Sequence, residues 1–364
     1  MKVIIGDLTK IRTGKLDANA SSEDGQYPFF TCSRETLKIS TYSYDCECVL
    51  VAGNGDLNVK YYNGKFDAYQ RTYIIEDNGS GKLFMPYLYY FMEGYIEELR
   101  KQAIGGVIKY IKLGNLTDAL IELPSVDEQK TIVDILEKSK KVLDMRHEEI
   151  SKLDDLIKAR FVEMFGDAIH NDKGWETDEV EKLCKEIYGG GTPSKLHSEY
   201  YEDGDIPWIS SKDMKTDVLT DSQIKINQLG VDNSTARMVP INSVIMVIRS
   251  GILKHTLPVA INVVPITVNQ DLKVFIPNER VLTRFLAVQF KMHEKDILSG
   301  VRVVTADNIE FNSLKQRKLI VPPIELQQEY VSFVEQIDKS KVAVQKALDE
   351  AQLLFDSLMQ EYFG

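Results

Sequence analysis

Two segments of the chain are copies of one another, and this repeat constrains the fold more than any other feature. Residues 123–166 and residues 321–364 align without a gap. Both copies open on a proline and a short polar box, continue as helix-compatible sequence, and close on Phe-Gly. A whole duplicated unit predicts a chain built from two equivalent halves. The identical positions are Pro124/Pro322, Gln129/Gln327, Val133/Val331, Glu137/Glu335, Lys141/Lys339, Leu156/Leu354, Glu163/Glu361, Phe165/Phe363 and Gly166/Gly364.

Each copy predicts one long helix with an apolar seam. A heptad frame places apolar residues along one side of both copies, which is typical of helices that pair. Ser125 and Glu128 form a capping box at the start of the first helix, and Pro323 suits the first turn of the second. Gly166 and Gly364 are expected to end the helices. The residues expected to pair are Leu136, Leu143, Ile150, Ile157, Val334, Leu348, Phe355 and Leu358.

The length of these helices favours pairing with each other. About 38 helical residues extend roughly 57 Å, more than a globular core can cover. Because each helix follows an equivalent domain, a pseudo-two-fold axis makes the expected pairing antiparallel. The alternative is that each helix packs only on its own domain.

Composition bounds the class of protein. The chain has 364 residues, 43% hydrophobic and 27% charged, which suits two soluble domains with sizeable cores. It contains neither a long apolar run nor a signal peptide, so a cytoplasmic location without membrane contact is expected. Cys32, Cys46, Cys48 and Cys184 form no CxxC pair, which argues against a zinc site.

Most of the net charge of −11 lies in the repeated segments, and the remainder of the chain is nearly neutral. An acidic total therefore does not exclude nucleic-acid binding, although it removes the simplest electrostatic argument for it.

A segment rich in short strands precedes each helix. Apolar, β-branched and aromatic runs alternate with Gly, Asn and Asp, and the landmarks come in the same order in both segments. The stretches between the landmarks differ, which suggests two sites doing the same kind of work on different targets. In the first segment we predict strands at 27–31, 48–52, 59–62 and 71–75 and a helix at 85–101; in the second, strands at 207–209, 244–248, 259–264 and 271–276 and a helix at 280–293.

With these features, the chain resembles the specificity subunits of type I restriction-modification systems. The resemblance rests on the repeated (Leu/Val)-Pro-x-x-(Asp/Glu)-x-Gln opening of each helix, the Phe-Gly close, Gly190-Gly191-Thr192-Pro193-Ser194, and Ile206-Pro207-Trp208-Ile209. It spans nearly the whole chain. The first segment departs from it, because Arg12-Thr13-Gly14-Lys15 stands where the second has Gly-Gly-Thr-Pro, and Phe29 stands where the second has Trp208.

The resemblance implies an architecture and partners. It implies an α+β chain with two α/β target-recognition domains, at 1–122 and 167–320, separated by two long antiparallel paired helices, a coiled coil at 123–166 and 321–364, with an internal pseudo-two-fold repeat. Each domain would read one half of a split site in double-stranded DNA. The helices would set the unread gap and dock two methyltransferase (modification) subunits, with restriction subunits as further partners.

The sequence offers no catalytic motif for the reactions of such a complex. We find no Asn-Pro-Pro-Tyr or Asp-Pro-Pro-Tyr element for adenine methylation, no Walker A loop, and no Ser-His-Asp context. Gly53-Asn54-Gly55-Asp56 is best interpreted as a hairpin turn. No catalytic residue, cofactor or metal is therefore expected. The alternatives are a structural scaffold and an unrecognised DNA-modifying enzyme.

Candidate DNA contacts are polar residues in the predicted loops. Arg favours guanine, and Asn and Gln favour adenine, although any one of these side chains is more often an ordinary surface group. Gly189-Gly190-Gly191 either allows a close approach of the backbone or forms a plain loop. The candidates are Arg12, Lys15, Arg34, Lys60, Tyr62, Gln70 and Arg71 in the first segment, and Thr192, Lys195, Ser211, Lys212, Arg237, Arg249, Lys254, Asn269, Gln270 and Arg302 in the second.

Overall fold

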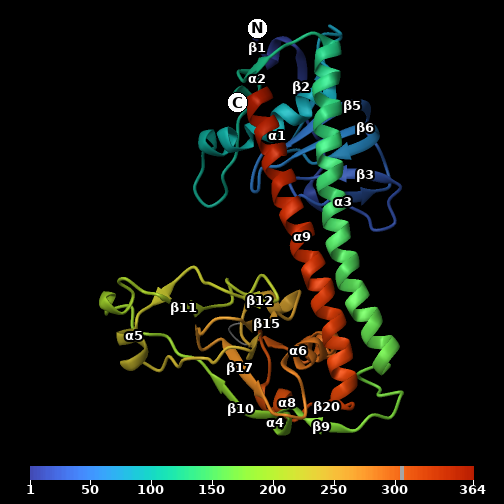
Figure 1. Ribbon diagram of the computed structural model, residues 1–364. Coiled ribbons are helices and arrows are strands. Elements are labelled where there is room, and N and C mark those ends of the chain that lie inside the picture. The colour runs from blue at the N-terminus through green and yellow to red at the C-terminus, as the bar shows by residue number, and fades with distance from the viewer. Residues whose placement is uncertain (304–306) are drawn as a thin grey trace. The chain divides into compact units, whose positions relative to one another are not determined.

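The chain divides into two compact units. The structure is a computed structural model that describes residues 1–303 and 307–364, except for the side chains of residues 302 and 303. Unit 1 comprises Met1–Glu149 with Val344–Gly364, and unit 2 comprises Ile150–Ala343. Figure 1 shows the mixed helices and strands of both. Within the described ranges, no helix combines the length and the apolar character needed to cross a membrane.

Unit 1 is built on a six-stranded sheet. The strand order is β2-β7-β5-β6-β3-β4, and all neighbours are antiparallel except β3 and β6. A separate pair joins β1 to β8, so the start of the domain meets the strand that precedes the long helix. The elements are β1 (Lys2–Ile4), β2 (Thr9–Thr13), β3 (Tyr27–Phe30), β4 (Leu37–Ile39), β5 (Tyr44–Ala52), β6 (Val59–Ala68), β7 (Thr72–Asp77), α1 (Met85–Gln102), α2 (Leu113–Thr117), β8 (Leu120–Glu122) and the start of α3 (Val126–Phe165).

Unit 2 repeats this plan, although its counterparts of β5 and β6 are shorter. Its sheets have the orders β10-β17-β14-β15-β12 and β13-β11-β16, and β20 pairs with β9 as β8 pairs with β1. The single strand β6 of unit 1 corresponds to β15 and β16 together. The elements are β9 (Thr177–Glu179), α4 (Val180–Leu183), β10 (Cys184–Gly189), β11 (Ile206–Ile209), β12 (Val218–Leu219), β13 (Lys225–Ile226), α5 (Gln228–Asp232), β14 (Val244–Val247), β15 (Val259–Asn262), β16 (Thr267–Val268), β17 (Leu272–Pro277), α6 (Thr283–Met292), α7 (Glu294–Ser299), β18 (Arg302–Val303), β19 (Asp307–Asn308), α8 (Phe311–Lys315), β20 (Lys318–Ile320) and α9 (Ile324–Phe363).

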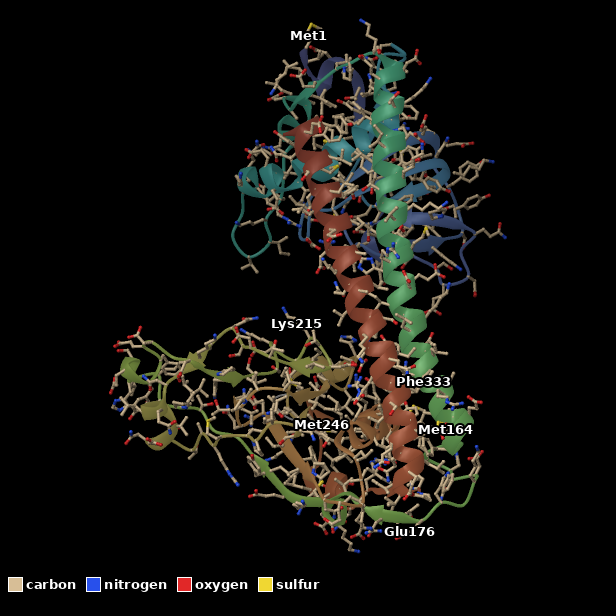
Figure 2. All side chains as sticks on the ribbon, viewed as in Figure 1. Met1, Met164, Glu176, Lys215, Met246 and Phe333 are labelled. Atoms are coloured by element: carbon tan, nitrogen blue, oxygen red, sulfur yellow. The ribbon has the colours of Figure 1, made fainter. Side chains whose placement is uncertain are left out.

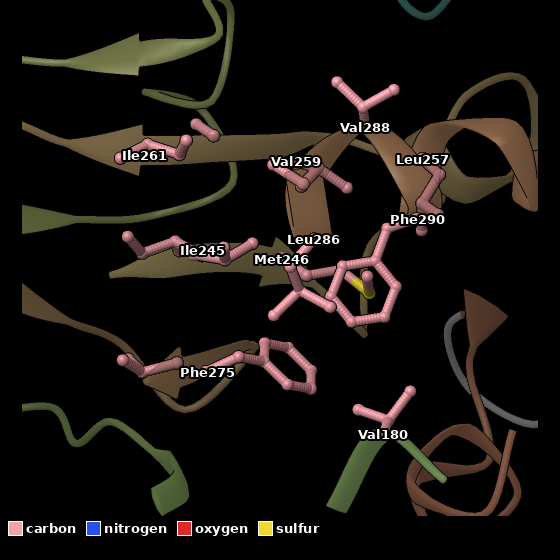
Figure 3. Close-up of a cluster of buried hydrophobic side chains, with 14 of the residues drawn as sticks. Val180, Ile245, Met246, Leu257, Val259, Ile261, Phe275, Leu286, Val288 and Phe290 are labelled. Atoms are coloured by element: carbon pink, nitrogen blue, oxygen red, sulfur yellow. The ribbon is translucent and has the colours of Figure 1, made fainter. Parts of the chain in front are cut away.

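One helix covers the main sheet in each unit. In unit 2 the apolar face of α6 packs on β14 and β17, and Figure 3 shows Leu286 and Phe290 pointing toward Met246. The rings of Phe275 and Phe290 lie 5.0 Å apart. In unit 1 the corresponding helix is α1, whose Tyr87 is 1% exposed. Burying each such side chain contributes about 1.5–3 kcal/mol, so these layers hold the sheets in place.

The ends of the long helices follow the sequence signals. The Glu128 carboxylate accepts from Ser125 N at 2.8 Å, and Glu128 N donates to Ser125 Oγ at 3.3 Å, which confirms the capping box. Gly166 has a φ of 75° and donates to Val162 O at 2.8 Å, so it ends α3 as predicted. Pro323 lies one residue before α9 and accepts its first backbone hydrogen bonds.

The two long helices pair with opposite directions. In unit 2 the end of α3 lies against the start of α9: Tyr330 Oη donates to Ile157 O at 3.0 Å, and Arg160 pairs with Glu329 at 2.9 Å. Met164 and Phe333, labelled in Figure 2, pack against the same core there. These contacts make the two helices antiparallel, so the alternative of helices that pack only on their own domains is wrong.

In unit 1 the start of α3 and the end of α9 share one apolar cluster. Leu136 is fully buried in this cluster, and Phe355 and Leu358 pack against it. Leu143 and Leu348 are each 7% exposed. Among the other residues expected to pair, Val334 and Ile157 are buried in unit 2, and Ile150 is half-buried.

The predicted elements of both domains are present, and most differ from the structure only at their ends. The largest differences are in β6, which extends to Ala68 beyond the predicted end at residue 62, and in β5, which begins at Tyr44 before the predicted start at residue 48. The predicted hairpin turn at Gly53-Asn54-Gly55-Asp56 is confirmed, since it lies in the connection between the antiparallel strands β5 and β6.

Candidate nucleic-acid interface

The connecting loops of unit 1 meet at one edge of its sheet. Strands β2, β3 and β5 end at this edge, and β6 and β7 begin there. Backbone hydrogen bonds tie the loops together: Gly53 N donates to Arg71 O at 2.8 Å, Tyr69 N to Phe30 O at 2.9 Å, and Lys15 N to Ala68 O at 3.2 Å. We call residues 13–16, 31–36, 53–58, 69–71 and 103–112 the loop edge of unit 1.

Unit 2 builds the same edge with the same hydrogen bonds. Ile248 N donates to Asp271 O at 2.9 Å, Asn269 N to Ile209 O at 2.9 Å, and Gly191 N to Val268 O at 3.0 Å. These bonds make Gln70 and Gln270 equivalent, because each lies in the loop that leads into the matching strand, β7 or β17. We call residues 189–195, 210–213, 248–258, 269–271 and 307–308 the loop edge of unit 2.

Several of the predicted contacts of unit 1 lie on its loop edge. Lys15, Gln70 and Arg71 are exposed there. Arg34 is exposed but pairs with Asp56 at 2.7 Å, and this ion pair lowers the pKa of the Asp56 carboxyl. The half-buried Lys60 ammonium donates to Ser33 O, and burial lowers its pKa. Lys60 is therefore less available to a phosphate than its residue type suggests.

Two candidates of unit 1 lie on the face of the sheet rather than its edge. The Arg12 guanidinium pairs with Glu76 at 2.7 Å and lies 4.7 Å from the Tyr44 ring centre. The Tyr62 ring packs 5.2 Å from Phe30. Both side chains are half-buried, so they support the sheet.

The loop edge of unit 2 gathers most of its candidates into one polar cluster. The Thr192 hydroxyl donates to Gln270 Oε1. Arg249 pairs with Asp271 at 2.5 Å, and Asn269 Nδ2 donates to the other carboxylate oxygen at 3.2 Å. The remaining candidates at this edge are exposed or half-buried in the adjoining loops: Lys195, Ser211, Lys212 and Lys254. Lys254 lies 3.9 Å from Asp307.

Two arginine candidates of unit 2 stand apart. Arg237 donates to both carboxylate oxygens of Glu186, at 2.6 and 2.8 Å, and lies 4.0 Å from the Tyr188 ring centre. This bidentate pair lowers the pKa of Glu186 and uses the guanidinium internally. Arg302 has its backbone in β18, and its side chain lies outside what the structure describes.

The glycine run of unit 2 allows its loop to pack closely against the backbone of a neighbouring strand. A Cβ added at Gly190 would lie 1.8 Å from Val268 O, so this loop can pack on β16 only without a side chain. Gly14 occupies the matching position in unit 1, where a Cβ would lie 2.2 Å from Ala68 O. The close approach that the sequence suggested is therefore an approach to the neighbouring strand.

A pocket on the loop edge of unit 1 includes residues that the sequence analysis missed. Its volume is about 320 Å³. The Tyr73 hydroxyl donates to Ile111 O at 3.2 Å and fixes one wall, and burial raises the pKa of that hydroxyl. Gln70 and Arg71 were predicted, whereas Tyr73 and Tyr110 were not. The lining residues are Thr13, Gly53, Gln70, Arg71, Tyr73, Tyr110 and Ile111.

A short hairpin beside the pocket carries an apolar tip. Ile104 and Tyr110 exchange backbone hydrogen bonds of 3.0 and 2.9 Å, and Ile111 N donates to Gly53 O at 2.9 Å. At the tip, Val107 is fully exposed and Ile108 is 62% exposed. The sequence signal for this hairpin is Gly105-Gly106 between apolar residues, a pattern typical of hairpin turns.

The described part of the chain offers no grouping of His, Cys, Asp and Glu suited to holding a metal ion. The polar side chains at the two loop edges can form hydrogen bonds and bear charge, which is the chemistry of recognition.

Comparison with known proteins identifies the family. The family model for the type I restriction modification DNA specificity domain matches residues 1–154 and 172–351. The chain is 44% identical over 135 residues to the type I restriction enzyme EcoDI specificity subunit of Escherichia coli, covering 37% of this chain but only 30% of that protein. It is 30% identical over 285 residues to the EcoR124I/EcoR124II specificity subunit of Escherichia coli, covering 76% of this chain and 68% of that protein.

Two solved structures are similar over the whole chain. The type I restriction-modification S subunit from M. genitalium superposes with a TM-score of 0.62 at 15% identity, covering 100% of this chain and 96% of that chain. A chain from the structural work on complex assembly and conformational transition of the type I R-M system gives a TM-score of 0.55 at 16% identity, covering 100% and 97%. At such identities these likenesses concern the fold alone. Because the family model matches most of its length, the chain belongs to the type I restriction-modification DNA specificity family, the DNA-recognition subunits of these systems.

Proposed function

We propose that this chain is the non-catalytic subunit that selects the DNA sequence for a type I restriction-modification complex. Each target-recognition domain, 1–122 and 167–320, reads one half of a bipartite site in double-stranded DNA through its loop edge. The observation that carries this proposal is the repeated edge itself, which has the same backbone hydrogen bonds in both units but different side chains. Equal scaffolds with different polar surfaces suit two readings of unlike sequences.

The paired helices, at 123–166 and 321–364, set the number of unread base pairs and dock two modification subunits. Their acidic surfaces support a role toward protein rather than phosphate, because like charge repels the DNA backbone. Restriction subunits are further partners of the same assembly. The missing methyltransferase and Walker motifs support the assignment of methyl transfer and ATP use to those partners.

The test is selection from a randomised DNA pool by the chain assembled with its modification subunits. We expect two short fixed sequences separated by a gap of constant length. Gln270→Ala should change the base preference in one half only, because Gln270 projects from the edge of one domain. The matched control is Gln228→Ala, an exposed glutamine of α5 away from the loop edge, which should leave both halves unchanged.

Other results would contradict the proposal. A pool without any enriched sequence would favour a structural scaffold. Methyl transfer to DNA by the chain alone, with a methyl donor, would favour an enzyme. If Gln270→Ala weakens binding equally on all sequences, Gln270 contacts the sugar-phosphate backbone and does not read a base.

A further inference from the structure

Among the arginines whose side chains the structure describes, Arg71 differs from the others in forming no ion pair with a described carboxylate. Every other arginine whose side chain the structure describes forms an ion pair with a carboxylate. The Arg71 side chain is exposed and lies beside the pocket of unit 1. A free guanidinium on a surface where guanidinium groups are otherwise paired is available to a ligand.

The backbone of Arg71 is held although its side chain is free. Arg71 O accepts from Gly53 N at 2.8 Å and from Cys32 Sγ at 3.6 Å. A Cβ on Gly53 would lie 2.3 Å from that same oxygen, so the loop at Gly53 must approach this closely. The next residue is fixed as well, since Thr72 Oγ1 donates to Phe30 O at 3.2 Å. The guanidinium therefore projects from a rigid base, which reduces the entropy lost on binding.

The equivalent position in unit 2 has the opposite charge. Asp271 follows Gln270 as Arg71 follows Gln70, and its carboxylate neutralises Arg249. The two loop edges thus share a glutamine and differ at the residue after it. Such a difference is expected if the two target-recognition domains prefer different bases.

The charge needed for phosphate contacts is available elsewhere on the same edge. Lys15 and Lys109 are exposed there, and neither forms an ion pair with another described residue. Arg71 instead lies beside Gln70 at a concave site with Tyr73 and Tyr110 on its walls. A planar guanidinium at such a site can donate two parallel hydrogen bonds, which is the geometry that the O6 and N7 atoms of guanine accept.

We propose that Arg71 reads a guanine in the half-site of the first domain by donating to O6 and N7 in the major groove. This inference rests on the proposed function, since it presumes that the loop edge faces DNA. It adds the base that is read and the residue that reads it. Lysine is a poorer donor than Arg71 in this role, because an ammonium lacks the planar fork that donates two parallel hydrogen bonds.

The experiment selects bound DNA from a randomised pool with the assembled complex carrying the wild-type chain, Arg71→Lys or Arg71→Ala. Both variants should lose about 10-fold or more of the preference for guanine at one position of one half-site. The other positions and the second half-site should be unchanged. Arg146→Lys is the matched control and should leave both half-sites unchanged, because Arg146 lies on α3, outside the loop edge, and is paired with Glu149 at 2.7 Å.

The outcomes separate this inference from the proposed function. An enriched bipartite site that Arg71→Lys leaves intact, a uniform loss on all sequences, or a lost preference for another base would overturn the inference and leave the proposed function standing. A wild-type complex that enriches no sequence would overturn both. Thermal unfolding of Arg71→Lys should match wild type, and a variant that fails to fold would contradict the finding that this side chain has no partner among the described residues.

Discussion

At the scale of single residues, the repeated glutamines explain how each helix is joined to its domain. Gln129 is fully buried; its Oε1 accepts from Phe84 N at 2.8 Å, and its Nε2 donates to Lys82 O at 2.8 Å and Pro124 O at 3.0 Å. Gln327 repeats the arrangement in unit 2, with Leu282 N, Arg280 O and Pro322 O. Each glutamine ties the start of a long helix to the loop that precedes α1 or α6.

Gln129→Ala should therefore lower the free energy of unfolding by about 2–3 kcal/mol, because it leaves buried polar groups without partners. The measurement is urea denaturation of the purified chain. Gln352→Ala is the control, since Gln352 is exposed and bonds only to Asp356 of its own helix; it should change stability by less than about 0.5 kcal/mol. Equal effects of the two substitutions would contradict this role for Gln129.

Residue type alone predicted that some candidate residues lie in the loops, but it did not predict which of them pair with other side chains of the chain. Gln70, Arg71 and Gln270 lie on the loop edges as expected of polar residues in turns. Arg237 and Arg12 were chosen for the same reason, yet Glu186 and Glu76 bind them from distant parts of the chain. Such pairings depend on strand register, which a single sequence does not display.

At the scale of elements, the end of α3 depends on a left-handed residue. Gly166 has a φ of 75°, and a Cβ there would lie 2.0 Å from Asp172 Oδ1, which accepts from Asp167 N at 2.7 Å. Gly166→Ala should reduce stability by at least about 1 kcal/mol through strain and the displaced carboxylate. The matched variant is Gly300→Ala at the end of α7, where φ is −89° and an added Cβ would lie 3.6 Å from Ile297 O, an ordinary contact.

Denaturation curves of the two glycine variants give the comparison. Gly300→Ala should stay within about 0.5 kcal/mol of wild type. A Gly166→Ala chain as stable as Gly300→Ala would show that another residue ends α3.

The elements that the sequence predicted are those with a strong periodic pattern. The long helices and the buried strands β5, β14 and β17 have this pattern. The end of β6 was missed because Asn63, Gly64 and Asp67 disfavour strands, yet Gly64 pairs with Cys46 of β5 across the sheet. The two-residue strands β12, β13 and β16 are too short to show any period.

At the scale of the whole molecule, duplication accounts for features that no single element explains. The two units have matching strand orders, matching loop hydrogen bonds and matching glutamines. The sequence revealed the repeat in the helices, where it is best preserved. In the domains the repeat is carried by backbone pairing rather than residue identity, so the equivalence of Gln70 with Gln270 needed the structure.

The proposed role of the helices makes a prediction about the DNA site. One added heptad in each helix, after Glu149 in α3 and after Ala343 in α9, preserves the apolar seam because the pattern repeats every seven residues. It lengthens each helix by about 10 Å, which equals about three base pairs of duplex at roughly 3.4 Å each. We expect the complex with the lengthened chain to select the same two half-sites with a gap about three base pairs longer.

The control inserts the same number of residues in the exposed loop between Gly79 and Ser80. This insertion should leave the gap unchanged, because that loop lies outside both helices. An unchanged gap with lengthened helices would show that something other than the paired helices fixes the spacing.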